Sequence, residues 1–283
     1  MAIKNIAVIG AGTMGSGIAH VFALNNYNVS LIDTYLPSLD KGIKSIGSNL
    51  ERQVKKGSIT PDQKETALAR IITSSEINAV QKDTDLVIEA IIENKEAKLS
   101  LYKQLNSLIK DECILASNTS SISITELGAH NRPDQFIGMH FMNPVPVMQL
   151  VEIIRGYATS DATFSTIEQL ALDLGKTPVE VFDYPGFIAN RILMPMINEA
   201  VYALYEGVAS AKDIDTVMKL GMNHPMGPLT LADFIGLDVC LAIMDVLYTG
   251  FNDSKYRPCP LLKKMVAAGK LGRKTKSGFF SYE

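Results

Sequence analysis

Tryptophan is absent from the 283-residue sequence, and cysteine occurs only three times, at Cys113, Cys240 and Cys259. The three cysteines are far apart and lack the short spacings of a metal site, so we predict no bound metal and expect free thiols. Free thiols are typical of proteins kept in a reducing compartment. The sequence therefore predicts a cytoplasmic protein.

Long apolar runs and an excess of charge of one sign are also missing. The 27 basic and 30 acidic residues give a net charge of −3, which does not favour binding to nucleic acid. The most apolar stretch of the second half, residues 229–248, contains three aspartates, so we expect one buried helix and no membrane span. The apolar start of the chain is short and continues into a glycine-rich motif, which favours a strand over a secretory signal.

Apolar, β-branched runs alternate with helix-length segments in the first half of the chain. This alternation predicts a parallel sheet with crossover helices, an α/β doubly wound fold of the Rossmann type. We expect strands at residues 3–9, 29–33, 85–89, 113–116, 135–140, 150–154 and 177–183. The second and third of these are separated by a helical insertion at about 36–70, read as helices at 36–57 and 60–70, the latter opened by the capping sequence that starts at Thr60.

After Pro185 the strand pattern stops, and the remaining sequence reads as almost wholly helical. We therefore predict two domains, an α/β domain at 1–184 and an all-α C-terminal domain at 185–283. Helical domains with apolar faces left over commonly associate in pairs. The second domain is accordingly expected to form a homodimer.

A glycine-rich motif with the spacing G-x-G-x-x-G follows the first predicted strand, at Gly10, Gly12 and Gly15. Such glycines permit a tight turn and let a pyrophosphate approach the N-terminus of the next helix. Asp33 ends the second predicted strand, where an acid can accept both hydroxyls of the adenosine ribose. An ordinary glycine turn and a strand-ending aspartate are the plainer interpretation of each feature alone, but together they predict NAD as the cofactor.

Polar residues follow two later predicted strands, among them His140. If strands 135–140 and 149–154 pair antiparallel around Pro146, positions 140 and 152 lie opposite each other. Glu152 would then accept the N–H of one imidazole nitrogen and leave the other nitrogen as a base. A histidine is more often a packed or surface residue, but this pairing is what the oxidation of an alcohol requires.

Five signatures extend over nearly the whole chain, at residues 117–121, 140–146, 185–191, 224–228 and 271–274. In their order and spacing they resemble the L-3-hydroxyacyl-CoA dehydrogenase family, and within it the bacterial, clostridial-type short-chain 3-hydroxybutyryl-CoA dehydrogenases. The resemblance implies an NAD-dependent enzyme with an acyl-CoA substrate. It would interconvert (S)-3-hydroxybutyryl-CoA and acetoacetyl-CoA by hydride transfer at C3.

The resemblance also implies a role for individual residues. It makes His140 the acid/base and Glu152 its partner, with Ser120 donating to the C3 oxygen of the substrate. A further polar contact in the reacting pocket is implied at Asn190. Cofactor contacts are implied at Glu93, Lys98, Asn143 and Lys274. Contacts with the coenzyme A moiety are implied at Lys56 and, where some relatives have serine, at Asn49.

The helical insertion offers separate support for an acyl-CoA substrate. Its first helix is rich in lysine and could hold the phosphates of coenzyme A. A merely solvated helix face remains an alternative.

Two other functions stay open. One is an NAD-dependent dehydrogenase of free 3-hydroxy acids or sugar acids, of the L-gulonate type. The other is a non-catalytic NAD-binding protein. Turnover of acetoacetyl-CoA would distinguish them.

Overall fold

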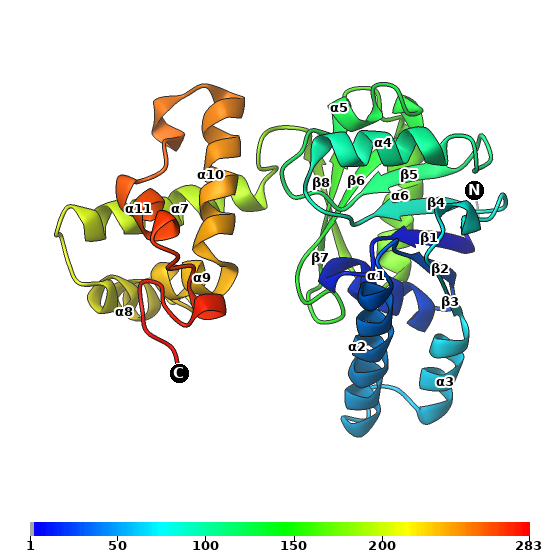
Figure 1. Cartoon of the computed structure of the whole chain (residues 1–283), viewed down its shortest axis with the longest axis horizontal. Coiled ribbons are helices and arrows are strands. Elements are labelled where there is room, and N and C mark those ends of the chain that lie inside the picture. The colour runs from blue at the N-terminus through cyan, green and yellow to red at the C-terminus, as the bar shows by residue number, and fades with distance from the viewer. Residues whose placement is uncertain (1–2) are drawn as a thin grey trace. The chain divides into compact units, whose positions relative to one another are not determined.

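The computed structural model describes residues 3–283 and divides into two compact units, the first ending at Asp183 and the second beginning at Tyr184 (Figure 1). The first unit is an α/β structure, and the second is helical. This is the predicted fold class.

One eight-stranded sheet forms the centre of the first unit, with the strand order β3-β2-β1-β4-β5-β6-β7-β8. The strands are β1 (Asn5–Ile9), β2 (Asn28–Ile32), β3 (Ile71–Ser74), β4 (Leu86–Glu89), β5 (Ile114–Ser117), β6 (Phe136–Phe141), β7 (Leu150–Arg155) and β8 (Thr177–Phe182). Neighbours are parallel except β6 and β7, which are antiparallel. The chain leaves β1 in both directions, to β2 and to β4, and ligands of such sheets bind beyond the carboxyl ends of the strands at this switch point.

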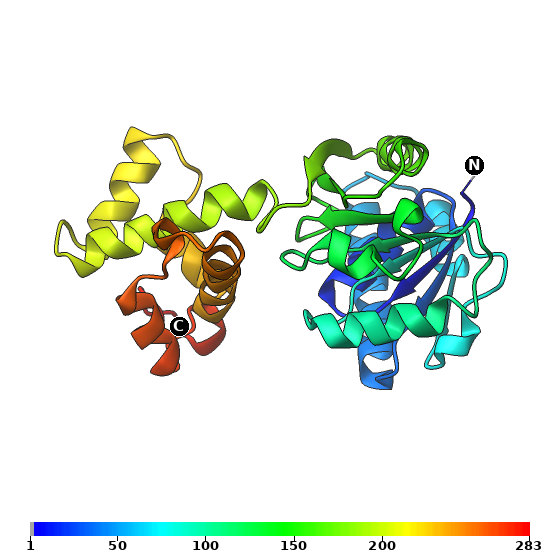
Figure 2. The ribbon, with the colours of Figure 1, turned by 90° about the horizontal axis from the view of Figure 1, so that it is seen from above.

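Helices cover both faces of the sheet. Those of the first unit are α1 (Thr13–Leu24), α2 (Leu36–Lys55), α3 (Pro61–Ala69), α4 (Lys95–Leu105), α5 (Ile124–Gly128) and α6 (Asp161–Asp173), with short 3₁₀ turns η1 (Ile77–Ala79) and η2 (Pro133–Gln135). Apolar residues of α1 and α6 share one core cluster with the strands, whereas α4 lies on the opposite side of the sheet (Figure 2). Strands β4 and β5 are buried along their whole length, as expected for a sheet covered on both faces.

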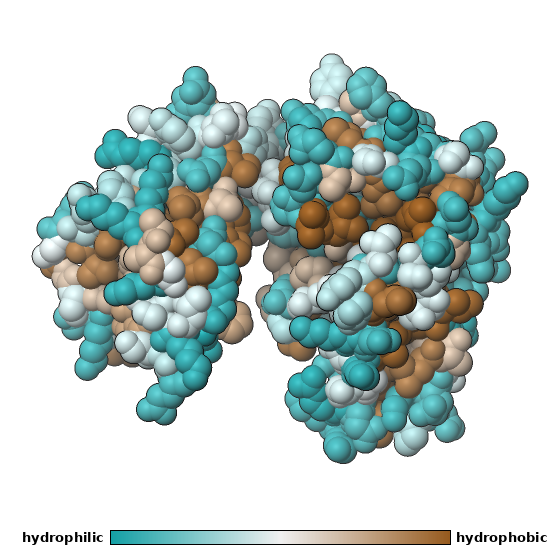
Figure 3. Space-filling model, viewed as in Figure 1, coloured by the Kyte–Doolittle hydropathy of each residue, from teal (hydrophilic) through white to brown (hydrophobic). Residues whose placement is uncertain are grey.

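The insertion between β2 and β3 consists of α2 and α3, as predicted. Thr60 and Gln63 form the expected capping box, in which Thr60 Oγ1 accepts from the amide of Gln63 at 3.2 Å and Gln63 Oε1 accepts from the amide of Thr60 at 2.8 Å. The stripe Leu39, Ile46 and Leu50 of α2 is buried in the same core cluster as α1. The C-terminal end of α2 is covered by hydrophilic side chains (Figure 3).

The second unit is built from α7 (Ala189–Tyr205), α8 (Ala211–Gly221), α9 (Pro228–Ile235), α10 (Leu237–Phe251) and α11 (Pro260–Ala267), with the 3₁₀ turns η3 (Ser254–Tyr256) and η4 (Arg273–Thr275). Residues of α7, α9, α10 and α11 form its apolar core. The carboxylate of Asp233, buried at the edge of this core, accepts from the amides of Phe279 and Phe280 at 3.0 and 2.9 Å. The last residues of the chain are thereby fixed to α9.

Two sequence-based expectations differ from the structure. Residues 229–248 do not form one helix, because Gly236 has a positive φ of 105° that ends α9 and begins α10. Strand β3 was not predicted, since Ile71–Ser74 follows a helix directly and is only partly buried. Cys113, Cys240 and Cys259 are buried free thiols, as expected. None of the helices described here is long and apolar enough to cross a membrane.

Candidate active site

The glycine-rich turn lies between β1 and α1. At Gly10, φ is 104° and a Cβ atom would lie 2.5 Å from the carbonyl oxygen of Ala90. A Cβ atom at Gly15 would lie 1.7 Å from the carbonyl oxygen of Gly10, so the helix can approach the turn only without a side chain there. Gly12, in contrast, faces open space, with no atom within 4 Å of its hypothetical Cβ. The turn thus presents bare backbone at the start of α1, which fits the pyrophosphate of NAD.

Asp33 follows β2 and lies beside this turn. Its carboxylate accepts from the amide of Ala11 at 2.8 Å and from the amide of Tyr35 at 2.9 Å. The side chain is half-buried at the carboxyl edge of the sheet. Both amide contacts fix the position of the carboxylate at the strand end, where the fingerprint requires an acceptor for the ribose.

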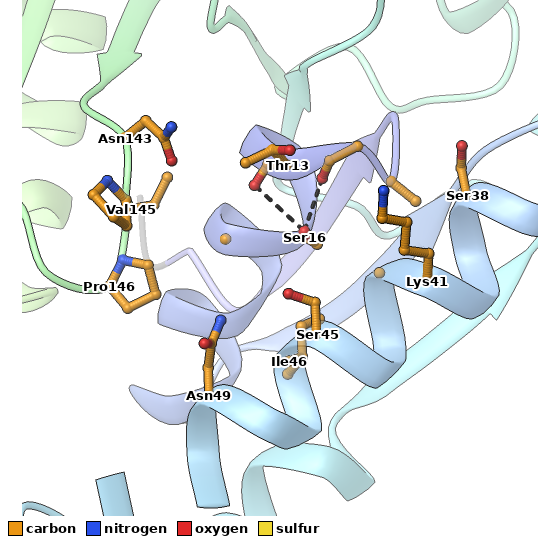
Figure 4. Close-up of a pocket in the computed structure, with 15 residues that line it drawn as sticks. Thr13, Ser16, Ser38, Lys41, Ser45, Ile46, Asn49, Asn143, Val145 and Pro146 are labelled. Carbon is orange, nitrogen blue, oxygen red and sulfur yellow. Dashed lines mark hydrogen bonds between the residues drawn. The ribbon is translucent and has the colours of Figure 1, made fainter. Parts of the chain in front are cut away.

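A cavity of about 230 Å³ opens beside the glycine turn. It is bounded by the start of α1, one face of α2 and the loop at 143–146, with Asn143 and Asn49 among its lining residues (Figure 4). Lys41 is the cationic side chain in that lining. Asn49 also accepts a hydrogen bond from Arg52. The cavity therefore joins the predicted cofactor turn to the helical insertion.

Lys56 lies outside this lining, at the residue that caps the C-terminus of α2. It is exposed and stands next to Arg52 and Lys55 of the last helical turn. Positive charge at a helix C-terminus is favoured by the helix dipole, which is a sufficient structural reason for these residues. Its contact with coenzyme A remains a prediction.

His140 and Glu152 lie opposite each other in the antiparallel pair β6 and β7, in the register predicted from the sequence. The distance between Nδ1 of His140 and Oε2 of Glu152 is 2.7 Å. Both residues are nearly removed from solvent, at 9% and 2% exposure. Since His140 is next to the last residue of β6, the pair lies toward the carboxyl end of that strand, and Asn143, which lines the cavity, follows three positions later.

Ser120 belongs to a loop held by the carboxylate of Glu93. One oxygen of Glu93 accepts from the hydroxyl of Thr119 at 2.5 Å, from the amide of Ser120 at 3.0 Å and from the hydroxyl of Ser121 at 2.9 Å. Burial by itself would raise the pKa of Glu93, but the Lys98 ammonium and the Thr119 and Ser121 hydroxyls outweigh it and lower the pKa. Glu93 is thus an ionised acceptor around which the loop is folded.

Lys98 is 1% exposed and lies between two carboxylates. Its ammonium is 2.5 Å from Glu89 and 3.3 Å from Glu93. The second oxygen of Glu89 accepts from the hydroxyl of Ser117 at 2.7 Å and from that of Tyr102 at 3.2 Å. Sequence reasoning missed Glu89, although an acid ending a buried strand, nine positions before a lysine, is a usable signal. The structure connects Lys98 to the Ser120 loop through Glu93, and its cofactor contact stays a prediction.

Asn190 and Lys274 belong to the second unit. Asn190 is buried in the first turn of α7. Lys274 lies in η4 and forms an ion pair with both carboxylate oxygens of Asp238, at 2.5 and 2.6 Å. Their contacts with substrate and cofactor stay predictions.

Comparison with known families decides the assignment of the fold. Residues 5–184 match the model described as "3-hydroxyacyl-CoA dehydrogenase, NAD binding domain", and residues 186–282 match "3-hydroxyacyl-CoA dehydrogenase, C-terminal domain". The chain belongs to the 3-hydroxyacyl-CoA dehydrogenase family. As a member of this family it is an NAD-dependent oxidoreductase, and its glycine turn and Asp33 belong to the NAD-binding domain.

Individual members of the 3-hydroxyacyl-CoA dehydrogenase family are similar over the full length. The chain is 58% identical over 276 residues to a probable 3-hydroxybutyryl-CoA dehydrogenase of Deinococcus radiodurans, which covers 97% of this chain and 99% of the relative. It is 55% identical over 281 residues to a 3-hydroxybutyryl-CoA dehydrogenase of Bradyrhizobium diazoefficiens, covering 99% and 96%. The crystal structure of (S)-3-hydroxybutyryl-CoA dehydrogenase from Ralstonia eutropha superimposes with a TM-score of 0.96 at 52% identity, with all of both chains covered.

Proposed function

We propose that this chain interconverts (S)-3-hydroxybutyryl-CoA and acetoacetyl-CoA with NAD, using His140 and Glu152 as the acid/base pair. The observation that carries the proposal is the 2.7 Å contact between His140 and Glu152, close in sequence to the cavity-lining Asn143. Relatives at 55% and 58% identity bear the name 3-hydroxybutyryl-CoA dehydrogenase, which supports the substrate.

The chemistry of the pair follows from its donors and acceptors. An ionised carboxylate can only accept, so Nδ1 of His140 carries the proton that Glu152 binds, and Nε2 is the basic nitrogen. Nε2 takes the proton of the C3 hydroxyl during oxidation and returns it during reduction. Bound NAD supplies the acceptor or donor of the C3 hydride. Glu152 stabilises the imidazolium formed when His140 is protonated.

Further residues are assigned to the proposed site. Ser120 donates to the C3 oxygen of the substrate, and the Glu93 network gives its loop a defined conformation. Asn143 contacts the cofactor from the rim of the cavity, and Asn190 is a further polar contact with the substrate. Glu93, Lys98 and Lys274 are proposed to contact NAD.

Recognition of the coenzyme A moiety is assigned to the helical insertion. Asn49 lines the cavity and Lys56 caps the same helix, so both lie along α2. Lysine ammonium groups bind phosphate as point charges, and the phosphates of coenzyme A are the groups that a free hydroxy acid lacks. This favours an acyl-CoA substrate over the free 3-hydroxy or sugar acid of the L-gulonate type.

We further propose that two copies associate through the second unit in the cytoplasm. Helix α8 and the residue after it expose the apolar side chains of Val217, Leu220 and Met222. Exposed apolar clusters of this kind mark protein interfaces. Light scattering of the purified chain gives the mass directly, and a monomeric mass at micromolar concentration would refute the association.

The assay for the function is the consumption of NADH with acetoacetyl-CoA, compared with the oxidation of L-gulonate and of free 3-hydroxybutyrate with NAD. We expect turnover with acetoacetyl-CoA and at least about a hundredfold lower kcat/KM with either free acid, because a free acid lacks the whole coenzyme A moiety and so loses the binding energy of that remote part of the substrate. Comparable efficiency with a free acid would favour a dehydrogenase of free 3-hydroxy or sugar acids over an acyl-CoA dehydrogenase. Binding of NADH without turnover of any of these compounds would favour a non-catalytic protein.

A further inference from the structure

The loop between β6 and β7, residues 142–149, connects His140 to Glu152 and carries Asn143. Its internal hydrogen bonds are few: the amides of Val147 and Met148 both donate to the carbonyl of Pro144, at 3.0 Å each. This pattern satisfies two donors with one acceptor. Other carbonyls of the loop must therefore find donors elsewhere.

Lys176 supplies the missing donors. Its ammonium donates to the carbonyl of Val145 at 2.6 Å and to the carbonyl of Met148 at 2.8 Å. Lys176 directly precedes β8, and the next amide, that of Thr177, donates to the carbonyl of Gln149 at 2.8 Å. The lysine thus ties both ends of the loop's central turn to the edge of the sheet.

The environment of Lys176 is unusual for a lysine. The residue is 8% exposed, and no carboxylate among residues 3–283 lies within ion-pairing distance of its nitrogen. Burial lowers its pKa. A buried ammonium without a counter-charge is costly, so the two carbonyl contacts are the interactions that compensate for it.

The loop has little other support. A polar cavity of about 230 Å³ lies under it, lined in part by His20, Gln53 and Lys176 itself. Val147 and Met148 point largely into solvent, with 72% and 41% of their surface exposed. Val145 is the fully buried apolar side chain of the loop and lies against α1, and Met142 and Pro146 are half-buried.

The contact between Val145 and α1 links the position of the loop to the position of Asn143 beside the glycine-rich turn. A Cβ atom on Gly17 of α1 would lie 2.9 Å from Cβ of Val145, so loop and helix touch at a point with no room for adjustment. Figure 4 shows Asn143, Val145 and Pro146 along the side of the cavity that faces α1. A shift of this loop displaces Asn143 relative to the glycine turn.

We propose that Lys176 is a positioning residue for the reaction, acting by fixing the loop that places Asn143 beside the cofactor turn and joins the strands of His140 and Glu152. The proposal rests on the proposed function. Lys176 touches neither the cofactor turn nor the acid/base pair in any contact described here, so its effect is exerted through the backbone of the loop.

The test compares Lys176→Met, which keeps the length and loses the donors, with Lys176→Arg, which retains several donors. A displacement of reacting groups by about 1 Å can cost up to a hundredfold in rate, so we expect Lys176→Met to lower kcat roughly ten- to hundredfold while KM for acetoacetyl-CoA changes less than about threefold. Lys176→Arg should recover most of kcat. Rates are normalised to the sites that bind NADH in a fluorescence titration, so that a loss of folded protein does not lower kcat.

Lys110→Met is the matched control, because Lys110 binds a backbone carbonyl and Asp85 beside the opposite, amino-terminal edge of the sheet. It should lower the melting temperature and leave kcat unchanged. Equal kcat values for folded Lys176→Met and Lys110→Met would overturn the proposal. If Lys176→Met does not fold, Lys176→Leu, which also lacks the donors, takes its place with the same criterion.

Amide exchange provides a readout independent of turnover. The amides of Val147 and Met148 should exchange at least about tenfold faster in Lys176→Met than in the wild type, because their acceptor turn is released. Unchanged exchange would contradict the anchoring, and faster exchange with an unchanged kcat would contradict the positioning role. A wild-type chain that does not turn over acetoacetyl-CoA rejects the proposed function, and exchange then decides the anchoring alone.

Discussion

The proposed acid/base pair and the Ser120 loop are positioned in different ways. His140 and Glu152 lie on adjacent strands, and the backbone ladder between β6 and β7 sets their separation. Ser120 lies in a loop, and its position depends on Glu93, which is held in turn by Lys98. The first arrangement follows from strand register, and the second from a buried network of charges.

This difference determines how each arrangement can be damaged. A substitution at His140 or Glu152 removes a chemical group but leaves the ladder intact, so the chain should still fold, with some loss of stability because the remaining partner stays buried. A substitution in the network leaves Lys98 buried without full compensation, so folding itself is weakened. Measurements of kcat and of stability therefore separate a loss of chemistry from a loss of structure.

The largest effect is expected at the strand pair. Because positioned acid-base catalysis contributes on the order of 10² to 10⁴ in rate, His140→Ala should lose at least about a hundredfold in kcat and still bind NADH, since the glycine turn is untouched. Glu152→Gln keeps the size of the side chain but no longer stabilises the imidazolium, so its loss should be comparable. Steady-state kinetics and fluorescence titration measure the two properties.

The double variant shows whether the pair acts as a unit. With both groups removed, kcat should be little lower than in His140→Ala alone, because the effects of coupled residues do not add. Losses that multiply in the double variant, or near-normal turnover of His140→Ala, would show that another residue is the base.

A substitution in the network of Glu89, Lys98 and Glu93 should lower the free energy of unfolding. Glu89→Gln removes the charge nearest to Lys98, and breaking a buried ion pair on one side costs about 3–5 kcal/mol of unfolding free energy. Urea denaturation measures the difference. Glu112→Gln, an exposed carboxylate just before β5, is the matched control and should change stability by less than about 0.5 kcal/mol. An equally small change for Glu89→Gln would mean that the network does not hold the loop.

The preference for NADH over NADPH tests the proposed role of Asp33, which follows the last residue of β2. A 2′-phosphate roughly 5 Å from the Asp33 carboxylate would be repelled by about 3 kcal/mol per unit charge at an effective dielectric near 20, or roughly a hundredfold in affinity. The adjacent Thr34 offers no positive charge. NADH should therefore exceed NADPH in kcat/KM by about this factor, and Asp33→Ser should reduce the preference. Equal efficiency of the two cofactors in the wild type would contradict the role of Asp33.

The smallest effect is expected at the exposed end of α2. Lys56→Ala should raise KM for acetoacetyl-CoA by roughly three- to tenfold, about what one surface charge contributes to phosphate binding. The N-acetylcysteamine thioester lacks the phosphates and should be unaffected. Lys103→Ala, on the exposed side of α4, controls for the change in net charge. If both thioesters were affected equally, Lys56 would be structural.

Strand register could be predicted from the sequence because it is a local property. Two strand-like runs at 135–140 and 149–154, with positions 140 and 152 equidistant from Pro146, are sufficient to place His140 opposite Glu152. The glycine turn and Asp33 are likewise specified within one strand-turn-helix unit. The capping box at Thr60 was predicted for the same reason.

The remaining features depend on contacts distant in sequence or on weak local signals. Lys176 and the carbonyl of Val145 are 31 positions apart, and nothing in the local pattern marks this lysine as buried. β3 is short and lies at the edge of the sheet, so its apolar signal is confined to Ile71 and Ile72. Gly236 ends α9 with a positive φ, but a single glycine inside an apolar segment is only a weak local signal for a helix end.

The helical insertion leaves the sheet after β2 and returns to it at β3, and these two strands are neighbours in register, with Ile32 opposite Ser74. Because the two strands are parallel, the insertion starts at the carboxyl end of β2 and returns at the amino end of β3, where Ile71 lies opposite Val29, so its 38 residues serve as the crossover that a parallel pair requires. If α2 holds the coenzyme A moiety as proposed, another crossover that still covers α1 would redirect the enzyme to acyl groups on a different carrier. The carrier specificity and the redox chemistry would then be inherited separately.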